Sequence, residues 1–137
     1  MKYKLLVLDV DGTLLNDAKE ISKRTLASLL KVQQMGIRVA LASGRPTYGL
    51  MPLAKTLELG NYGGFIISYY GGQIINAQNG EILFERRINP EMLPYLEKKA
   101  RKNNFAIFTY HDDTILTDSS DNEPVRAEAN LNHLKII

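Results

Sequence analysis

The 137-residue chain contains no cysteine and no tryptophan. Without cysteine, disulfide bonds, thiolate metal sites and a cysteine nucleophile are excluded. The net charge is only +2, which is too small to favour nucleic acid or an anionic membrane surface as a partner. We therefore expect a protein that binds neither of them.

Long apolar runs are missing as well. No stretch approaches the roughly 18 residues that a membrane-spanning helix needs. The first apolar run, residues 5–8, is too short for the core of a signal peptide and is followed at once by Asp9. Together with the lack of cysteine, this leads us to expect a cytoplasmic protein. Its length allows one domain, or one small domain and part of another.

The first half of the chain alternates short apolar segments with segments of helical spacing. Residues 4–10, 37–42 and 64–68 are apolar and rich in β-formers, which predicts buried strands. Leucines recur at helical spacing over residues 23–35 and again after Pro46. Strand–helix–strand–helix–strand order predicts a parallel sheet. We therefore expect an α/β fold with a Rossmann-like core over residues 1–84.

Local signals refine these expected helices and the end of the core. Ser22 can cap the first helix, with Gln33 on its inner face, and Gly36 stands where that helix should end. Pro52 should kink the second helix or delay its start. Asn79-Gly80, between two apolar stretches, predicts a hairpin with a type I′ turn.

A second module is expected over residues 85–137, with an α+β pattern that remains incomplete. A helix is predicted over residues 90–102, a hairpin around Asp112-Asp113, and a last helix over residues 123–134. The side chains expected to face inward from the first of these helices are Met92, Leu93, Leu96 and Ala100.

Two carboxylates, Asp9 and Asp11, end the first expected strand. If β geometry persists to residue 11, the two side chains point the same way, at the carboxyl end of the strand, where ligands of open α/β sheets bind. Two like charges there can be relieved by a divalent cation such as Mg²⁺, or by a raised pKa that makes one of them a general acid. Phosphoryl transfer could use both. The alternative is an ordinary Asp-Gly turn.

The segment Ser43-Gly44-Arg45-Pro46 follows the second expected strand and opens the second helix. A hydroxyl, a backbone amide and a helix N-terminus together suit an anion, and Arg45 could add a bidentate contact to a phosphate. By itself the segment also reads as a plain strand-to-helix turn. The expected position at the same sheet edge as Asp9 favours the anion site.

These motifs resemble those of a known family. Asp-Val-Asp-Gly-Thr at 9–13 resembles the first motif of the haloacid dehalogenase-like (HAD) superfamily, and Ser-Gly-Arg at 43–45 resembles its second motif in the Cof-type phosphatases. The Asn-Gly hairpin and the Arg-Arg-Ile-Asn-Pro segment at 86–90 resemble a Cof-type core leading into its α/β (type IIB) cap.

The resemblance implies a Mg²⁺-dependent phosphatase that acts on small, sugar-phosphate-like metabolites through an aspartyl-phosphate. It implies that Asp9 is the nucleophile and a metal ligand, and that Asp11 is the general acid and base, whose carbonyl also binds Mg²⁺.

The resemblance also implies which residues hold the substrate. Ser43 and the amide of Gly44 would bind the phosphoryl group, and the amides of Asp11 and Gly12 would help to neutralise its oxygens. Arg45 would lie near the substrate entrance.

The chain departs from the family pattern in two places. The family's phosphate-binding Lys and late acidic motif follow the cap, whereas this chain ends at Ile137 and so resembles an N-terminal half only. Tyr70 stands where Cof-type proteins usually carry Asn before Gly. Two other interpretations therefore stay open: a catalytically incomplete fragment that binds phosphate and Mg²⁺, or half a fold that pairs through an exposed sheet edge.

Overall fold

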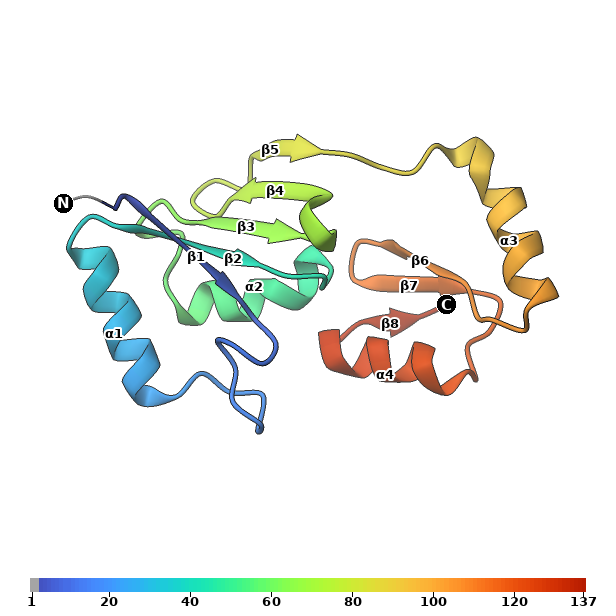
Figure 1. Ribbon diagram of the computed structural model, residues 1–137, viewed down its shortest axis with the longest axis horizontal. Coiled ribbons are helices and arrows are strands. Elements are labelled where there is room, and N and C mark those ends of the chain that lie inside the picture. Colours follow the sequence, from blue (N-terminus) through green and yellow to red (C-terminus); the bar gives the residue numbers. More distant parts are fainter. Residues whose placement is uncertain (1–2) are drawn as a thin grey trace. The chain divides into compact units, whose positions relative to one another are not determined.

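The computed structural model describes residues 3–137, and the chain divides into two compact units, Met1–Arg86 and Arg87–Ile137. Figure 1 shows the succession of helices and strands along the chain. None of the helices in this described part has the length and apolar character that a membrane crossing requires.

The first unit is built on a five-stranded sheet in the order β1-β2-β3-β4-β5. The pairs β1–β2 and β2–β3 are parallel, and β3–β4 and β4–β5 are antiparallel. This confirms the α/β class and the parallel core that the strand–helix alternation predicts. The strands are β1 (Leu5–Asp9), β2 (Arg38–Ala42), β3 (Phe65–Ser68), β4 (Gln73–Asn76) and β5 (Ile82–Glu85).

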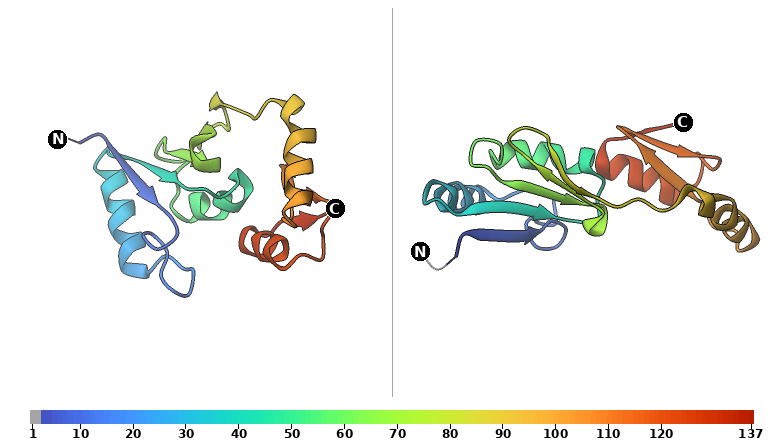
Figure 2. Two further views of the ribbon diagram at one scale, coloured as in Figure 1. Left: turned by 45° about the vertical axis from the view of Figure 1, so that its right-hand side comes forward. Right: turned by 90° about the horizontal axis from the view of Figure 1, so that it is seen from above.

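Two helices, α1 (Lys23–Gln34) and α2 (Thr47–Thr56), cover one face of this sheet (Figures 1 and 2). Pro52 lies inside α2, and the helix nevertheless begins at Thr47, so the expectation of a delayed start was wrong. The core between helices and sheet is formed by Val10, Leu14, Leu15, Leu29, Val39, Leu41, Leu50, Ala54, Leu57, Leu59 and Ile66.

The ends of α1 follow the sequence signals. The Ser22 hydroxyl accepts a hydrogen bond from the Thr25 amide at 3.1 Å, which satisfies one of the unpaired N–H groups of the first turn. Gly36 follows the helix with a φ of +85°, a conformation that few other residues adopt without strain. Gln33 is buried, and its Nε2 donates to the Leu57 carbonyl at 2.8 Å. The helix is therefore fixed at both ends.

We expect Ser22→Ala to lower the free energy of unfolding by about 1 kcal/mol, because the cap acceptor is lost. Urea denaturation of the 137-residue chain measures the change. Ser28→Ala is the matched control, since its exposed hydroxyl bonds only the Arg24 carbonyl inside the same helix. Equal losses in the two variants would contradict the capping role.

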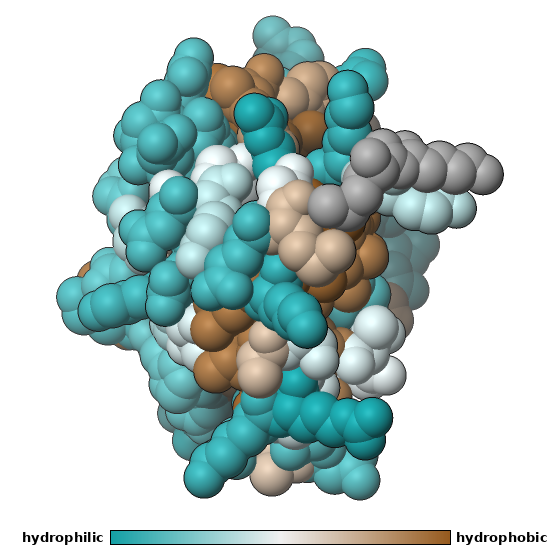
Figure 3. Space-filling view, turned by 90° about the vertical axis from the view of Figure 1, so that its left-hand side faces the viewer, coloured by the Kyte–Doolittle hydropathy of each residue, from teal (hydrophilic) through white to brown (hydrophobic). Residues whose placement is uncertain are grey.

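Strand β1 differs from the expectation of a fully buried strand. It is the edge strand of the sheet, and its residues alternate between part-buried and exposed. Leu5 and Val7 are 48% and 49% exposed, on the side of the strand opposite to Leu6 and Leu8. Figure 3 shows apolar surface between hydrophilic residues at this end of the first unit. Within the first unit, this face of β1 is therefore only half covered.

The hairpin between β4 and β5 forms as expected, but its turn is not type I′. A type I′ turn needs positive φ at both central residues, and only Gly80 has it. The Asn76 side chain accepts from the Gln78 amide at 2.9 Å, and the Asn79 side chain accepts from the Glu81 amide at 3.0 Å. These side-chain bonds stabilise a longer turn in place of the two-residue one.

The second unit contains a three-stranded sheet in the order β6-β7-β8, with β6–β7 antiparallel and β7–β8 parallel. Helix α4 connects β7 to β8, and Ile115, Val125 and Ala129 form the buried centre. The elements are α3 (Leu93–Lys102), β6 (Phe108–His111), β7 (Thr114–Thr117), α4 (Glu123–Asn132) and β8 (Lys135–Ile136), with a 3₁₀ turn at Pro90–Met92 before α3.

Helix α3 buries only part of the face that its spacing predicts. Leu93 and Met92, which lies in the preceding 3₁₀ turn, are about half exposed. Leu96 and Ala100 are part-buried, and no residue of the helix is fully buried. The helical spacing therefore predicted the position of the helix correctly but overestimated its burial. An apolar stripe indicates that a helix needs a partner surface, and the described part of the chain covers this stripe only in part.

Candidate active site

The carboxyl ends of β1, β2 and β3 lie side by side and form the carboxyl edge of the first sheet. In the register of the parallel strands, Asp9 pairs with Ala42, and Ala42 pairs with Ile67. The residues that follow these positions therefore leave the sheet side by side, as expected for parallel strands. Asp9, the Ser43–Arg45 segment and the segment after Ser68 thus lie at the same edge.

Asp9 is exposed at the end of β1. Within residues 3–137, its carboxylate takes part in no hydrogen bond or ion pair, whereas its backbone carbonyl accepts from the Leu14 amide at 3.2 Å. The backbone is thus held while the carboxylate stays accessible. A carboxylate in this state can bind a cation or attack an electrophile.

The carboxylate of Asp11 forms ion pairs with two positively charged side chains. Arg45 binds it in a bidentate manner, with Nε 2.8 Å from Oδ2 and the terminal nitrogen 2.7 Å from Oδ1, and Lys19 Nζ lies 3.2 Å from Oδ1. The Arg45 hydrogen bond is the main reason why the pKa of Asp11 is lowered, and partial burial opposes it. The direction is opposite to the raised pKa considered as one way to relieve the Asp9–Asp11 repulsion.

The turn after Asp11 depends on Gly12. Its φ is +79°, and the chain then turns back so that the Leu15 amide donates to the Val10 carbonyl at 3.0 Å. Leu14 and Leu15 are buried in the core. This anchors a loop whose other side carries the two carboxylates.

The Ser43–Arg45 segment is held by backbone hydrogen bonds to the end of β3. The Ser43 amide donates to the Ile67 carbonyl, the Tyr69 amide donates to the Arg45 carbonyl and the Tyr70 amide donates to the Ser43 carbonyl, at 3.0, 3.0 and 3.1 Å. Within residues 3–137, the Gly44 amide has no acceptor. The segment is thus rigid and keeps a free donor, as an anion site requires.

A buried polar network that sequence reasoning missed supports this segment. The hydroxyls of Thr47 and Ser68 are 2.7 Å apart, and Thr47 donates to Gln73 Oε1 at 2.6 Å. Gln73 in turn donates to Glu85 at 2.8 Å. The network ties the first residue of α2 to β3, β4 and β5. Its only signal in the sequence is a set of polar residues at the ends of apolar strands.

A hollow of about 610 Å³ lies at the opposite end of the same strands. It has no acidic side chain among its lining residues, so it offers no ligand for a hard cation and no carboxylate nucleophile. The hollow therefore lacks the carboxylates that the sequence-predicted site contains. The hollow is lined by Tyr3, Lys4, Leu5, Met35, Gly36, Ile37, Arg38 and Phe65.

The oxygen atoms at the carboxyl edge supply some, but not all, of the ligands that a hard cation needs. In the described part of the chain, no group of three or more His, Cys, Asp or Glu side chains could hold a metal ion. Mg²⁺, however, often binds through one or two carboxylates and takes its other ligands from water and phosphate. The accessible carboxylate of Asp9 and the carbonyl of Asp11 fit this pattern, while the Asp11 carboxylate is occupied by Arg45.

Comparison with known proteins shows the family to which the chain is related. The sequence profile of the haloacid dehalogenase-like hydrolases matches residues 6–136. The chain belongs to this family. The match includes the Asp9 loop, the Ser43–Arg45 segment and the second unit.

Among solved haloacid dehalogenase-like hydrolases, one from Bacteroides thetaiotaomicron is 48% identical, with a TM-score of 0.93. The similarity covers 99% of this chain and 51% of that one. The HMP-PP phosphatase of Cronobacter sakazakii is 27% identical over 86% of this chain and 42% of its own. The 5-amino-6-(5-phospho-D-ribitylamino)uracil phosphatase of Bacillus subtilis is 34% identical over 43% of this chain and 24% of its own. The chain thus spans about half the length of its relatives.

Proposed function

We propose that this chain carries the nucleophile and the phosphoryl-binding loop of a Mg²⁺-dependent phosphatase that works through an aspartyl-phosphate on Asp9. The main support is the state of the Asp9 carboxylate, which is accessible and makes no ion pair within residues 3–137. Membership of the haloacid dehalogenase-like hydrolases supports the reaction class.

In the first step, a carboxylate oxygen of Asp9 attacks phosphorus, and the bond between phosphorus and the ester oxygen breaks. Asp11 gives its proton to the leaving oxygen. The Gly44 amide and the Ser43 hydroxyl donate hydrogen bonds to the phosphoryl oxygens, and the amides of Asp11 and Gly12 add to this stabilisation. Asp9 and the Asp11 carbonyl would hold Mg²⁺, which when bound would supply positive charge beside the phosphoryl group.

In the second step, a water molecule attacks phosphorus, and Asp11 accepts its proton. Inorganic phosphate leaves, and Asp9 returns to its free form. Arg45 must release Asp11 from its bidentate contact for Asp11 to carry a proton. The phosphoryl group itself is an alternative partner for the Arg45 guanidinium, since it also offers a pair of negatively charged oxygens to the two N–H donors. Substrate binding would thus release Asp11 from Arg45, and once the exposed Lys19 also moves away, Asp11 can take up a proton from water and act as the acid.

The proposed substrates are small phosphorylated metabolites of the sugar-phosphate kind, and the proposed compartment is the cytoplasm. The relatives support the class, since one acts on HMP-PP and another on a uracil compound with a phosphoribityl group. We propose that residues 1–84 form the N-terminal part of the catalytic core and that residues 85–137 belong to a cap that selects the substrate. We expect neither nucleic acid nor a membrane as a partner.

Removal of Mg²⁺ tests the proposed function. The complete gene product should release phosphate from an aryl phosphate, and chelation with EDTA should abolish the release. Added Mg²⁺ should restore it, because neither Asp9 alone nor the backbone amides offset the charge of the transferring group. Continued turnover in EDTA, with Mg²⁺ removed by gel filtration, would contradict the proposal.

A second candidate is a module that binds phosphate and Mg²⁺ without turnover. It is favoured by the lack, within the described residues, of a third acidic ligand beside Asp9 and Asp11. Calorimetry of the 137-residue chain with Mg²⁺ and beryllofluoride separates the two candidates. Binding without hydrolysis by this chain supports the module, and turnover by this chain excludes it.

A further inference from the structure

Two consecutive tyrosines after β3 adopt a backbone conformation that bulky residues rarely take. Tyr69 and Tyr70 have φ values of 52° and 55°. This left-handed region is unfavourable for a side chain with a Cβ atom, and two such residues in a row add to the strain. Strain of this kind persists where the surroundings enforce it, and it is concentrated at functional sites.

The surroundings that enforce it are the residues of the phosphoryl-binding loop. The Tyr69 amide donates to the Arg45 carbonyl at 3.0 Å, and the Tyr70 amide donates to the Ser43 carbonyl at 3.1 Å. The two tyrosines are therefore fixed relative to the Gly44 amide that would hold the phosphoryl group.

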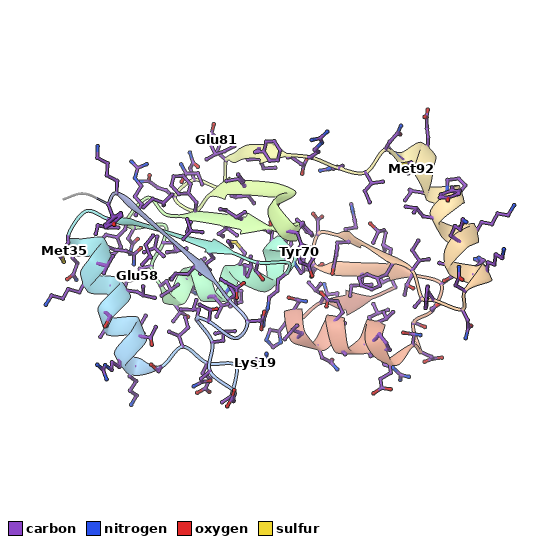
Figure 4. The ribbon with its side chains drawn as sticks, viewed as in Figure 1. Lys19, Met35, Glu58, Tyr70, Glu81 and Met92 are labelled. Carbon is purple, nitrogen blue, oxygen red and sulfur yellow. The ribbon has the colours of Figure 1, made fainter. Side chains whose placement is uncertain are left out.

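The ring of Tyr70 lies directly against Gly44. A Cβ atom added to Gly44 would be 2.3 Å from Cζ of that ring and 2.7 Å from both Cε atoms, so no larger residue fits there while the ring keeps its place. Tyr70 is also 93% exposed. The end of the ring thus rests on the loop, and most of its surface remains open to a ligand. Figure 4 labels Tyr70 at this edge of the first unit.

We propose that Tyr70 is a specificity-determining residue that stacks its ring on a planar ring in the leaving group of the substrate. The proposal rests on the proposed phosphatase function. A phosphoryl group held at Ser43 and Gly44 places its ester oxygen, and the group beyond it, next to Tyr70. An aromatic ring gains most from a second aromatic ring in an offset or edge-to-face arrangement. Because the amide of Tyr70 is bonded to the Ser43 carbonyl, its main chain is already ordered, and only side-chain freedom is lost when the stack forms.

Benzyl phosphate and cyclohexylmethyl phosphate test the proposal, because their leaving groups are similar in size and only one is planar. The complete gene product should show a kcat/KM for benzyl phosphate about 2- to 10-fold higher than for cyclohexylmethyl phosphate, the range expected for one aromatic pair. Tyr70→Phe should keep the preference and Tyr70→Leu should lose it. Tyr62→Leu, at the amino end of β3, is the matched control and should keep it.

An unchanged preference in Tyr70→Leu, or no preference in the unmodified protein, overturns the proposal. An equal loss on both substrates overturns it too, because it would indicate a purely structural role. Calorimetry with 2-phenylethylphosphonate and 2-cyclohexylethylphosphonate, in which CH₂ replaces the ester oxygen, measures the same preference as a ratio of binding constants without turnover. If only the phosphatase function fails, hydrolysis is absent while the aromatic phosphonate still binds more tightly than the cyclohexyl one. The two failures are therefore distinguishable.

Gly44→Ala tests the contact itself. Its Cβ would displace the Tyr70 ring, so the preference for the benzyl compound should fall to the level of Tyr70→Leu. The double variant Gly44→Ala/Tyr70→Leu should show no further fall, because both changes remove the same stack. Additive losses would contradict the contact.

Discussion

Asp9→Asn should reduce phosphate release by the complete gene product by a factor on the order of 10³ or more, because the amide cannot form the covalent bond to phosphorus. The same variant should leave the free energy of unfolding of the 137-residue chain almost unchanged. Asp9 is exposed and its carboxylate makes no ion pair within residues 3–137, so its loss removes chemistry and no stabilising contact.

Initial rates with an aryl phosphate and urea denaturation provide the two measurements. Asp17→Asn is the matched control, because Asp17 is an exposed carboxylate in the loop that follows the same strand. It should change neither quantity. Asp9→Ala is tested in parallel, since slow deamidation of the introduced asparagine would restore the carboxylate. If Asp9→Ala keeps its rate, Asp9 is not the nucleophile and the proposed mechanism fails.

The position of the site could be predicted from the sequence because it follows from topology. Once residues 4–10 and 37–42 are neighbouring parallel strands, Asp9 and Ser43 must leave the sheet at one edge. The partner of Asp11 could not be predicted in this way. Arg45 lies 34 residues away, and its long side chain could have reached solvent, a ligand or either carboxylate. That choice depends on side-chain packing, which a local pattern does not describe.

The fold shows the same division between local and non-local information. Ser22 and Gly36 fix the ends of α1 through contacts within a few residues, so both were predicted correctly. The burial of β1 and of α3 was overestimated, since only one side of each is part-buried. Apolar spacing indicates which surface must be covered, whereas the covering group can belong to any other part of the protein. Leu5 and Leu93 are thus apolar, regularly spaced and still half exposed.

Asp11→Asn should affect both activity and stability, in contrast to Asp9→Asn. The loss of the general acid and base should reduce the rate by a factor of about 10² to 10⁴. The free energy of unfolding should fall by about 1–3 kcal/mol, because the Arg45 side chain, only 9% exposed, keeps its charge and loses its carboxylate. The lower part of this range is expected, since Asp11 is 36% exposed and water can partly replace it.

A double variant separates the two effects of Asp11. Arg45→Met removes the buried charge, so Asp11→Asn/Arg45→Met should be more stable than the sum of the two single changes predicts. Its activity should stay as low as that of Asp11→Asn, because the proton donor is still missing. Urea denaturation and steady-state rates of all four proteins complete the cycle. Additive stability changes would contradict the Arg45–Asp11 contact, and recovered activity would contradict the role of Asp11 in proton transfer.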